Sequence, residues 1–310
     1  MASVQTGRTV GLGILKLDQP YVSRSPMQLA LSRFWRSQLA VSGLVIILIL
    51  LIVAVSASIV APYDPHDLNP NKDPSGQTAV NQSPNGTNPM GTDSLGRDLF
   101  SQLIFGSRVS LAVGFITQSV VLLIGIPIGM LAGFFGGWID NLTMRITDVM
   151  YAFPGLLFVI LLVSIMGRSI WVIFLSLGLA SWPTMARVVR GQVMQVRRMD
   201  YVMAANSVGA TDLQLVIRHI MPNILAPVIV LVTLAFPANI IAEATLTFLG
   251  LGVDPSTPTW GTMVNQAFPG IASYPWAVIF PSAAIAVTTL AFSFFGDGVR
   301  DAFDPRSTIK

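Results

Sequence analysis

The residue types that most often carry enzymatic chemistry are scarce in this sequence. Two of the 310 residues are histidine, His66 and His219, and none is cysteine, so these side chains cannot build a metal site. No Gly-Lys dipeptide occurs, which excludes the Walker A loop that holds nucleotide phosphates. Ser307 and Lys310 match a Ser-x-x-Lys pattern, but four residues without a supporting fold do not indicate a nucleophile. We expect no catalytic residue, no metal site and no cofactor in this chain.

Four glycines recur at intervals of four residues, at Gly125, Gly129, Gly133 and Gly137. On a helix this spacing forms a groove along one face. Helices in lipid associate by close packing through small residues, because the hydrophobic effect does not drive them together. We therefore expect this face to meet another helix, in the same chain or in a partner subunit. Pro127 lies within the stripe and is expected to kink the helix.

Further along the chain, three polar residues recur at helical spacing and form a polar ridge. Asn239, Glu243 and Thr247 are spaced four residues apart and share one face of a helix. Polar residues in a membrane helix mark a pathway or a contact with a partner in many proteins. The same residues are equally compatible with a helix end at the membrane surface that has no further role.

The elements that position these residues are six long segments without charge. The chain is 53% apolar and only 11% charged, whereas a soluble domain carries about 25% charged residues. Each segment has about the length of a bilayer crossing, roughly 20 residues. Six such segments disfavour the alternative of buried helices in a soluble protein, and the 38 residues before the first disfavour a secretory signal. The segments cover residues 39–61, 109–139, 149–166, 169–186, 220–242 and 275–296.

Basic residues concentrate in alternate connections, which predicts the orientation of the chain. We expect both termini and the 187–222 loop to face the cytoplasm. The predicted organisation is a cytoplasmic tail (1–38), a first membrane helix (39–61), an extracytoplasmic loop with a short interfacial helix (62–108), a core of five membrane helices (109–298) and a cytoplasmic tail (299–310).

The longest cytoplasmic connection has the pattern of a helical hairpin. Residues 200–208 suit a short amphipathic helix, and Gly209 can end it in a left-handed conformation. Thr211 or Asp212 can then cap a second helix that runs to Pro222. Two small residues, Ala204 and Ala205, lie side by side in the first helix. This patch is expected to enter a groove on another protein.

This hairpin resembles the EAA loop of ABC importer permeases. In that loop an acidic residue precedes two alanines, a glycine follows four residues after the second alanine, and a proline comes thirteen residues later; here these positions are Met203, Ala204, Ala205, Gly209 and Pro222. Met203 replaces the acidic residue, so a charge contact made there in the family is not expected. Four further stretches, at 61–65, 91–98, 247–261 and 296–306, resemble the C-type permease subunit of the dipeptide/oligopeptide/nickel ABC importers. The resemblance covers roughly residues 30–306.

The resemblance implies an all-α integral membrane protein of the type I ABC importer (MetI-like) architecture. It implies a second, B-type permease subunit, two ATPase subunits that bind ATP and magnesium, and an extracytoplasmic solute-binding protein, in a bacterial or archaeal cytoplasmic membrane. Contact with an ATPase subunit is then expected at Tyr201, Met203, Ala204, Ala205, Gly209, Ala210 and Pro222.

Three alternatives remain for the activity. Peptides are the expected cargo, but nickel or another small solute fits the same family. An ion-gradient-driven carrier would need charged residues at mid-membrane, and the six predicted segments have none. An intramembrane hydrolase would need a nucleophile and a base, and the sequence shows no such pair.

Overall fold

In the computed structural model, residues 26–67 and 79–304 are described. Within these two ranges the secondary structure is helical, apart from an isolated β-bridge between Thr92 and Asp98. Five helices are long and apolar enough to cross a membrane, and a bent pair of shorter helices makes a sixth crossing when taken as one span. The predicted all-α membrane fold is therefore confirmed.

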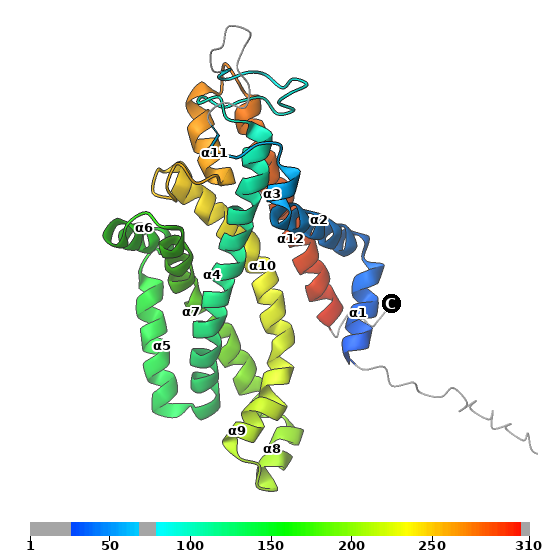
Figure 1. Cartoon of the computed structure of the whole chain (residues 1–310). Coiled ribbons are helices and arrows are strands. Elements are labelled where there is room, and N and C mark those ends of the chain that lie inside the picture. Colours follow the sequence, from blue (N-terminus) through cyan, green and yellow to red (C-terminus); the bar gives the residue numbers. More distant parts are fainter. Residues whose placement is uncertain (1–25, 68–78, 305–310) are drawn as a thin grey trace, which may run out of the picture.

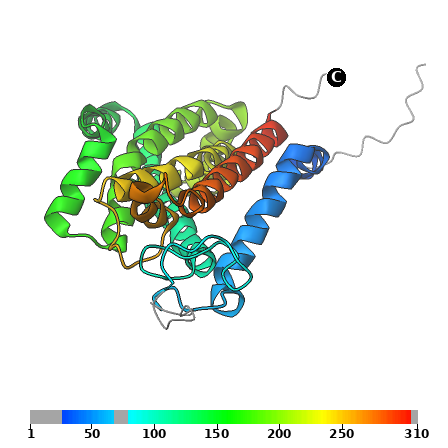
Figure 2. The same ribbon diagram turned by 90° about the horizontal axis from the view of Figure 1, so that it is seen from above.

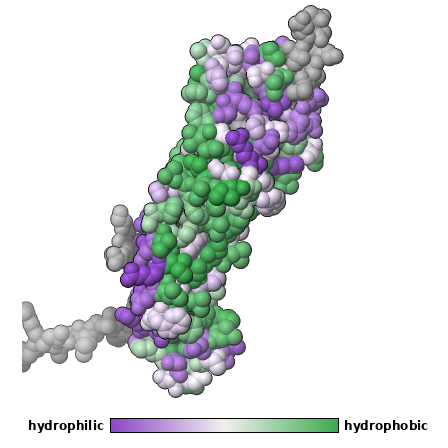
Figure 3. All heavy atoms as spheres, turned by 90° about the vertical axis from the view of Figure 1, so that its left-hand side faces the viewer, coloured by the Kyte–Doolittle hydropathy of each residue, from purple (hydrophilic) through white to green (hydrophobic). Residues whose placement is uncertain are grey.

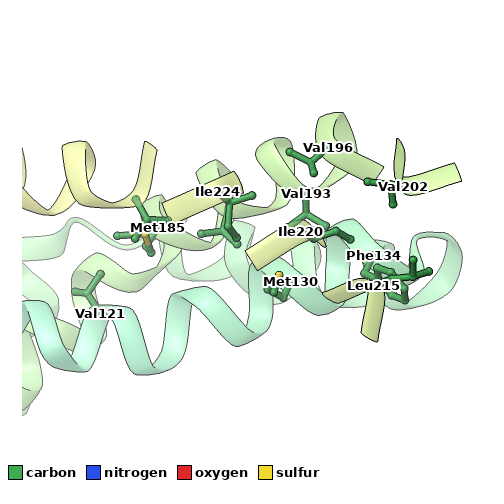
Figure 4. Close-up of a cluster of buried hydrophobic side chains, with 12 residues drawn as sticks. Val121, Met130, Phe134, Met185, Val193, Val196, Val202, Leu215, Ile220 and Ile224 are labelled. Atoms are coloured by element: carbon green, nitrogen blue, oxygen red, sulfur yellow. The ribbon is translucent and has the colours of Figure 1, made fainter. Parts of the chain in front are cut away.

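Three long helices form the centre of the molecule: α4 (Leu99–Phe135), α7 (Ile170–Arg197) and α10 (Met221–Phe248). They run side by side along the long axis (Figure 1). Buried aliphatic side chains fill the space between their lower halves, together with two short elements, α8 (Asp200–Ser207) and the π-helical turn Leu215–Ile220 (Figure 4). The end of the molecule that carries α8 is called the α8 end below.

A first flank of the bundle consists of α1 (Pro26–Arg36), α2 (Gln38–Val55), α3 (Ala57–Val60) and α12 (Trp276–Phe303) (Figures 1 and 2). The Ser37 hydroxyl accepts a hydrogen bond from the Ala40 amide and so caps α2. Phe34 of α1 packs against the end of α12. The parts of the predicted tails at residues 1–25 and 305–310 lie outside the described residues, and residues 299–303 complete α12.

The opposite flank holds the third span, which differs from the prediction. Instead of one helix over 149–166, the chain forms α5 (Gly137–Ala152) and α6 (Gly155–Met166), bent by 84° at Phe153 and Pro154. The residue before a proline avoids the helical region, which explains the break. The helical segment therefore starts at residue 137, twelve residues before the predicted span, and α5 includes charged residues such as Asp140.

The predicted interfacial helix before the second span is not a separate element. Asp98 caps α4, accepting a hydrogen bond from the Ser101 amide at 2.7 Å, and the helix then continues without a break to Phe135. No proline or glycine lies between Leu99 and Gly106, so no helix breaker separates the start of α4 from the span. Leu99 instead packs against a short helix, α11 (Trp260–Ala267). The end that carries α11 is called the α11 end below (Figure 1).

The surface supports insertion in a membrane. Figure 3 shows a broad hydrophobic band between the two ends on the face it presents, with polar residues gathered near the α11 end. Large apolar side chains such as Ile52 and Leu123 project outward from their helices. Such an extended apolar surface is typical of a protein that contacts lipid or other subunits.

Candidate functional site

The 200–212 segment folds as a hairpin that forms the tip of the α8 end (Figure 1). α8 ends at Ser207, and Gly209 follows in the left-handed region with φ of +90°. The Ala210 amide donates to the Ala205 carbonyl oxygen at 3.1 Å, and the Gly209 amide donates to that of Asn206 at 3.0 Å. These two bonds form a Schellman motif. The spacing from Ala205 to Gly209 and Ala210 thus follows from the way a helix ends.

A capping box starts the returning arm of the hairpin. The Thr211 hydroxyl accepts from the Gln214 amide, and the Gln214 side chain accepts from the Thr211 amide. The one-turn helix α9 (Asp212–Gln214), the π-helical turn and α10 follow as one continuous rod of 37 residues. Pro222 is the second residue of α10, directly after the π-helical turn. Because proline has no N–H, it cannot donate a backbone hydrogen bond at this point of the rod.

The hairpin presents apolar side chains outward. Two large apolar residues at the tip of the molecule are exposed: Val208 is 86% exposed and Met203 is 50% exposed. Val202, in contrast, is buried in the core cluster with Leu215 and Phe134. Of the predicted contact residues, Tyr201, Met203, Ala204, Gly209 and Pro222 are exposed, and Ala205 and Ala210 are half-buried. An exposed apolar tip anchored by one buried valine is suited to contact another protein.

Arg197 fastens the hairpin to α4. Its guanidinium donates to the Phe134 carbonyl oxygen and lies 5.2 Å from the centre of the Phe134 ring. A cavity of about 560 Å³ opens beside this contact, between the end of α4, the end of α7 and α8. The contact therefore joins the end of α7, shortly before the hairpin, to the end of α4.

The glycine stripe packs inside the chain, against α7. A Cβ on Gly129 would lie 2.5 Å from the Ala186 carbonyl oxygen, and Gly125 and Gly133 approach α7 as closely. Gly137 does not belong to this groove: α4 ends at Phe135, and Gly137 has a φ of +57° and opens α5. The helical repeat stops there because Gly136 and Gly137 adopt conformations that favour glycine. The sequence left open whether the partner helix belongs to the same chain or to another subunit. For three of the four glycines, the partner is α7 of the same chain.

The polar ridge on α10 divides into two parts, both buried within the chain. Glu243 accepts hydrogen bonds from the hydroxyls of Thr247 at 2.9 Å and Thr259 at 3.1 Å. Because Thr259 is the N-cap of α11, these bonds join α10 to α11. Asn239 instead lines a cavity between α4, α7 and α10. Gln118, on the facing side of that cavity, was not singled out from the sequence, although an amide in a long apolar run is a signal.

Helices α5 and α7 carry two ion pairs, at residues outside the segments predicted to be uncharged. Asp140 of α5 accepts from Arg190 of α7, and Asp148 accepts from Arg187 at 2.6 Å. The Arg187 guanidinium also lies 3.9 Å from the centre of the Tyr151 ring. These two arginines are thus each paired with a carboxylate on the neighbouring helix, and the pairs join α5 to α7.

A buried polar network at the α11 end was also missed. Asp93 accepts from the Arg97 side chain at 2.7 Å and from Gln102 at 2.9 Å, and Arg97 donates to Gln266 of α11 at 2.7 Å. Asn88 donates to Asp98 at 2.8 Å. An aspartate directly before an apolar helical run was the available signal, because this is the pattern of an N-cap.

Comparisons with known proteins agree with this architecture. Residues 125–309 match the family model of the binding-protein-dependent transport system inner membrane component, and residues 25–84 match the N-terminal TM domain of oligopeptide transport permease C. Two solved chains from the MetNI methionine ABC transporter in inward-facing conformations are similar in fold. Their TM-scores are 0.54 and 0.53, at 17% and 21% sequence identity, and they cover 65% and 66% of this chain and 96% and 97% of their own.

Curated relatives are similar over almost their whole length. The glutathione transport system permease protein GsiD of Pectobacterium atrosepticum is 38% identical, over 91% of this chain and 92% of the relative. The oligopeptide transport system permease protein OppC of Bacillus subtilis is 37% identical, over 93% of both chains. The dipeptide transport system permease protein DppC of Alkalihalophilus pseudofirmus is 36% identical, also over 93% of both. The chain therefore belongs to the binding-protein-dependent transport system inner membrane component family, as a DppC/OppC-like ABC importer permease.

Proposed function

We propose that this chain pairs with a homologous B-type permease subunit to form the translocation pathway of an ATP-driven peptide importer. Two ATPase subunits that bind ATP and magnesium would dock at the α8 end, and a solute-binding protein would deliver peptides to the α11 end. The observation that carries the proposal is the α8 hairpin, whose apolar side chains are exposed at the tip of the protein. Relatives named for oligopeptide, dipeptide and glutathione transport support a peptide cargo.

The orientation of the chain in the membrane follows from docking of the ATPase subunits at the α8 end. With the ATPase subunits on the cytoplasmic side, the α8 end and both termini face the cytoplasm, and the α11 end faces outward. The concentration of arginine at residues 187–218 supports this orientation. The membrane is the bacterial or archaeal cytoplasmic membrane.

Two connections transmit a movement of α8 through the bundle. Arg197 and Val202 link the hairpin to the end of α4. The rod from Asp212 to Phe248 links it to Glu243, which bonds Thr259 at the start of α11. Closure of the ATPase subunits would pull on α8, and the rod would carry that displacement toward the outer side. Prolines at 227 and 237 within α10 are points where the rod can flex.

The alternatives have less support. Nickel transport fits the same family, but the relatives compared above are named for peptides or glutathione. An ion-gradient-driven carrier would use titratable groups in the spans, and Arg187 and Arg190 of α7 are instead paired with aspartates of α5. Membership of an ABC permease family also disfavours a carrier.

The decisive test is an arginine in the small-residue patch of the hairpin. Ala205→Arg is expected to abolish recovery of the ATPase subunits with the purified permease and to abolish ATP-driven uptake, because a long charged side chain cannot enter a close helix-in-groove contact. Ala272→Arg is the matched control: the same substitution at an exposed site of the α11 end should preserve ATPase recovery. Normal recovery and uptake with Ala205→Arg would contradict the proposal.

A further inference from the structure

A small cavity lies between α4, α7 and α10, near the middle of these helices. Its volume is about 240 Å³. Its polar lining comes from Gln118 of α4, Ser181 and Thr184 of α7 and Asn239 of α10, and its apolar lining includes Met185 and Leu231. The lining carries no charged side chain.

Two buried amides of this cavity each have one polar atom without a hydrogen-bond partner. Gln118 is only 4% exposed and Asn239 only 6%. Among the described residues, nothing donates to the side-chain oxygen of Gln118, and nothing accepts from the side-chain nitrogen of Asn239. Buried polar groups in proteins are almost always paired, because an unpaired one destabilises the fold. Two such groups from different helices, lining one cavity, indicate a partner that this chain does not itself supply.

The chemistry of the lining selects the class of that partner. A side-chain amide offers both donors and an acceptor, and so complements the N–H and C=O of a peptide group. The cavity has no carboxylate, imidazole or thiol, which are the ligands that a nickel ion requires. Beside the cavity, Thr184 bonds the Tyr151 hydroxyl at 2.7 Å, and Arg187 next to Tyr151 is paired with Asp148. Glu243, one turn along α10 from Asn239, does not line the cavity and accepts from Thr247 and Thr259. The cavity is therefore suited to neutral polar groups.

We propose that Gln118 and Asn239 form a transient binding site for the peptide groups of the solute during its passage through the membrane. The inference rests on the proposed function and deepens it, since it selects an amide-containing cargo over a metal ion. The apolar lining would contact solute side chains without selecting among them, while the amides hold the backbone common to all peptides.

The test measures trialanine uptake by proteoliposomes that contain the whole complex, with ATP inside and saturating binding protein outside. Gln118→Leu and Asn239→Leu retain nearly the same side-chain volume but cannot form hydrogen bonds. Each is expected to lower the initial uptake rate roughly three- to tenfold, as the loss of one hydrogen bond predicts. Neither should lower complex recovery or thermal stability, because each removes an unpaired polar group. Ser119→Ala is the matched control on α4: its hydroxyl bonds the Phe115 carbonyl oxygen, and uptake should not change.

The outcomes separate the site from the proposed function. If the wild-type complex takes up no trialanine with ATP, the proposed peptide importer is wrong, and the site is wrong with it. If the wild type transports and both leucine variants transport equally well, the site alone is overturned. If the leucine variants instead lose complex recovery, the amides bind the second permease subunit and the solute site is also wrong.

Discussion

The two ends of the rod formed by residues 212–248 are held in opposite ways. At the α8 end, backbone hydrogen bonds shape a hairpin whose apolar side chains remain exposed. At the α11 end, buried carboxylates bind the connecting loop, α4, α10 and α11 to one another. The first end leaves apolar side chains uncovered, whereas the second satisfies most of its polar groups within the chain.

This difference separates what can move from what is fixed. The Asp93–Arg97 pair is fully enclosed, and Arg97 reaches α11 through Gln266. Breaking such a buried pair is costly because it leaves a charge without a partner. The hairpin contributes one fully buried residue, Val202, to the core, with Ala205 and Ala210 partly buried against it. We therefore expect substitutions at the α11 end to affect folding, and substitutions at the α8 end to affect coupling to ATP hydrolysis.

The largest effect is expected from Asp93→Ala. It removes the acceptor of Arg97, Gln102 and two backbone amides, and the loss of one member of a buried pair costs roughly 3–5 kcal/mol. The measurement is thermal unfolding of the purified permease in detergent. Asp254→Ala serves as the control, since Asp254 is exposed and bonds only the neighbouring Ser256. Equal unfolding midpoints for the two variants would show that the α11 end is no more rigid than its surface loops.

A smaller loss is expected from Thr259→Val. Valine has the same shape but neither caps α11 nor donates to Glu243, and a helix cap and a hydrogen bond are each worth about 1 kcal/mol. Thr245→Val provides the comparison on α10, because that hydroxyl is exposed and bonds only the Ile241 carbonyl oxygen of its own helix. If Thr259→Val leaves stability intact but reduces uptake, the α10–α11 contact takes part in the conformational change of transport and does not stabilise the fold.

The smallest change in stability is expected from Gly209→Ala. The φ of +90° disfavours any side chain, at a cost of roughly 1–2 kcal/mol, and this cost is confined to the exposed hairpin. We expect a nearly unchanged unfolding midpoint but fewer solutes transported per ATP hydrolysed. Gly191→Ala is the control, since a Cβ at Gly191 would meet nothing within 4 Å. A large drop in the unfolding midpoint would mean that the hairpin supports the bundle.

Much of this architecture was accessible from the sequence because its causes are local. Uncharged segments of the length of a bilayer indicated the spans, since lipid excludes charge and unpaired backbone groups. The hairpin was predictable because Gly209 and Thr211 act on residues within a few positions. Which polar residues of α10 are buried, and by what, was not predictable. Glu243, for example, is bonded by Thr259, which lies sixteen positions away on another element.

The sequence alone therefore determined the class of the protein, the position of most membrane helices and the shape of the α8 hairpin. Only the tertiary structure decided that the third span bends by 84° and that its charges pair with α7. It also decided that three glycines face α7 while the fourth does not, and that Gln118 and Asn239 share one cavity. Hydropathy and capping depend on neighbours along the chain, whereas these features depend on which helices are side by side.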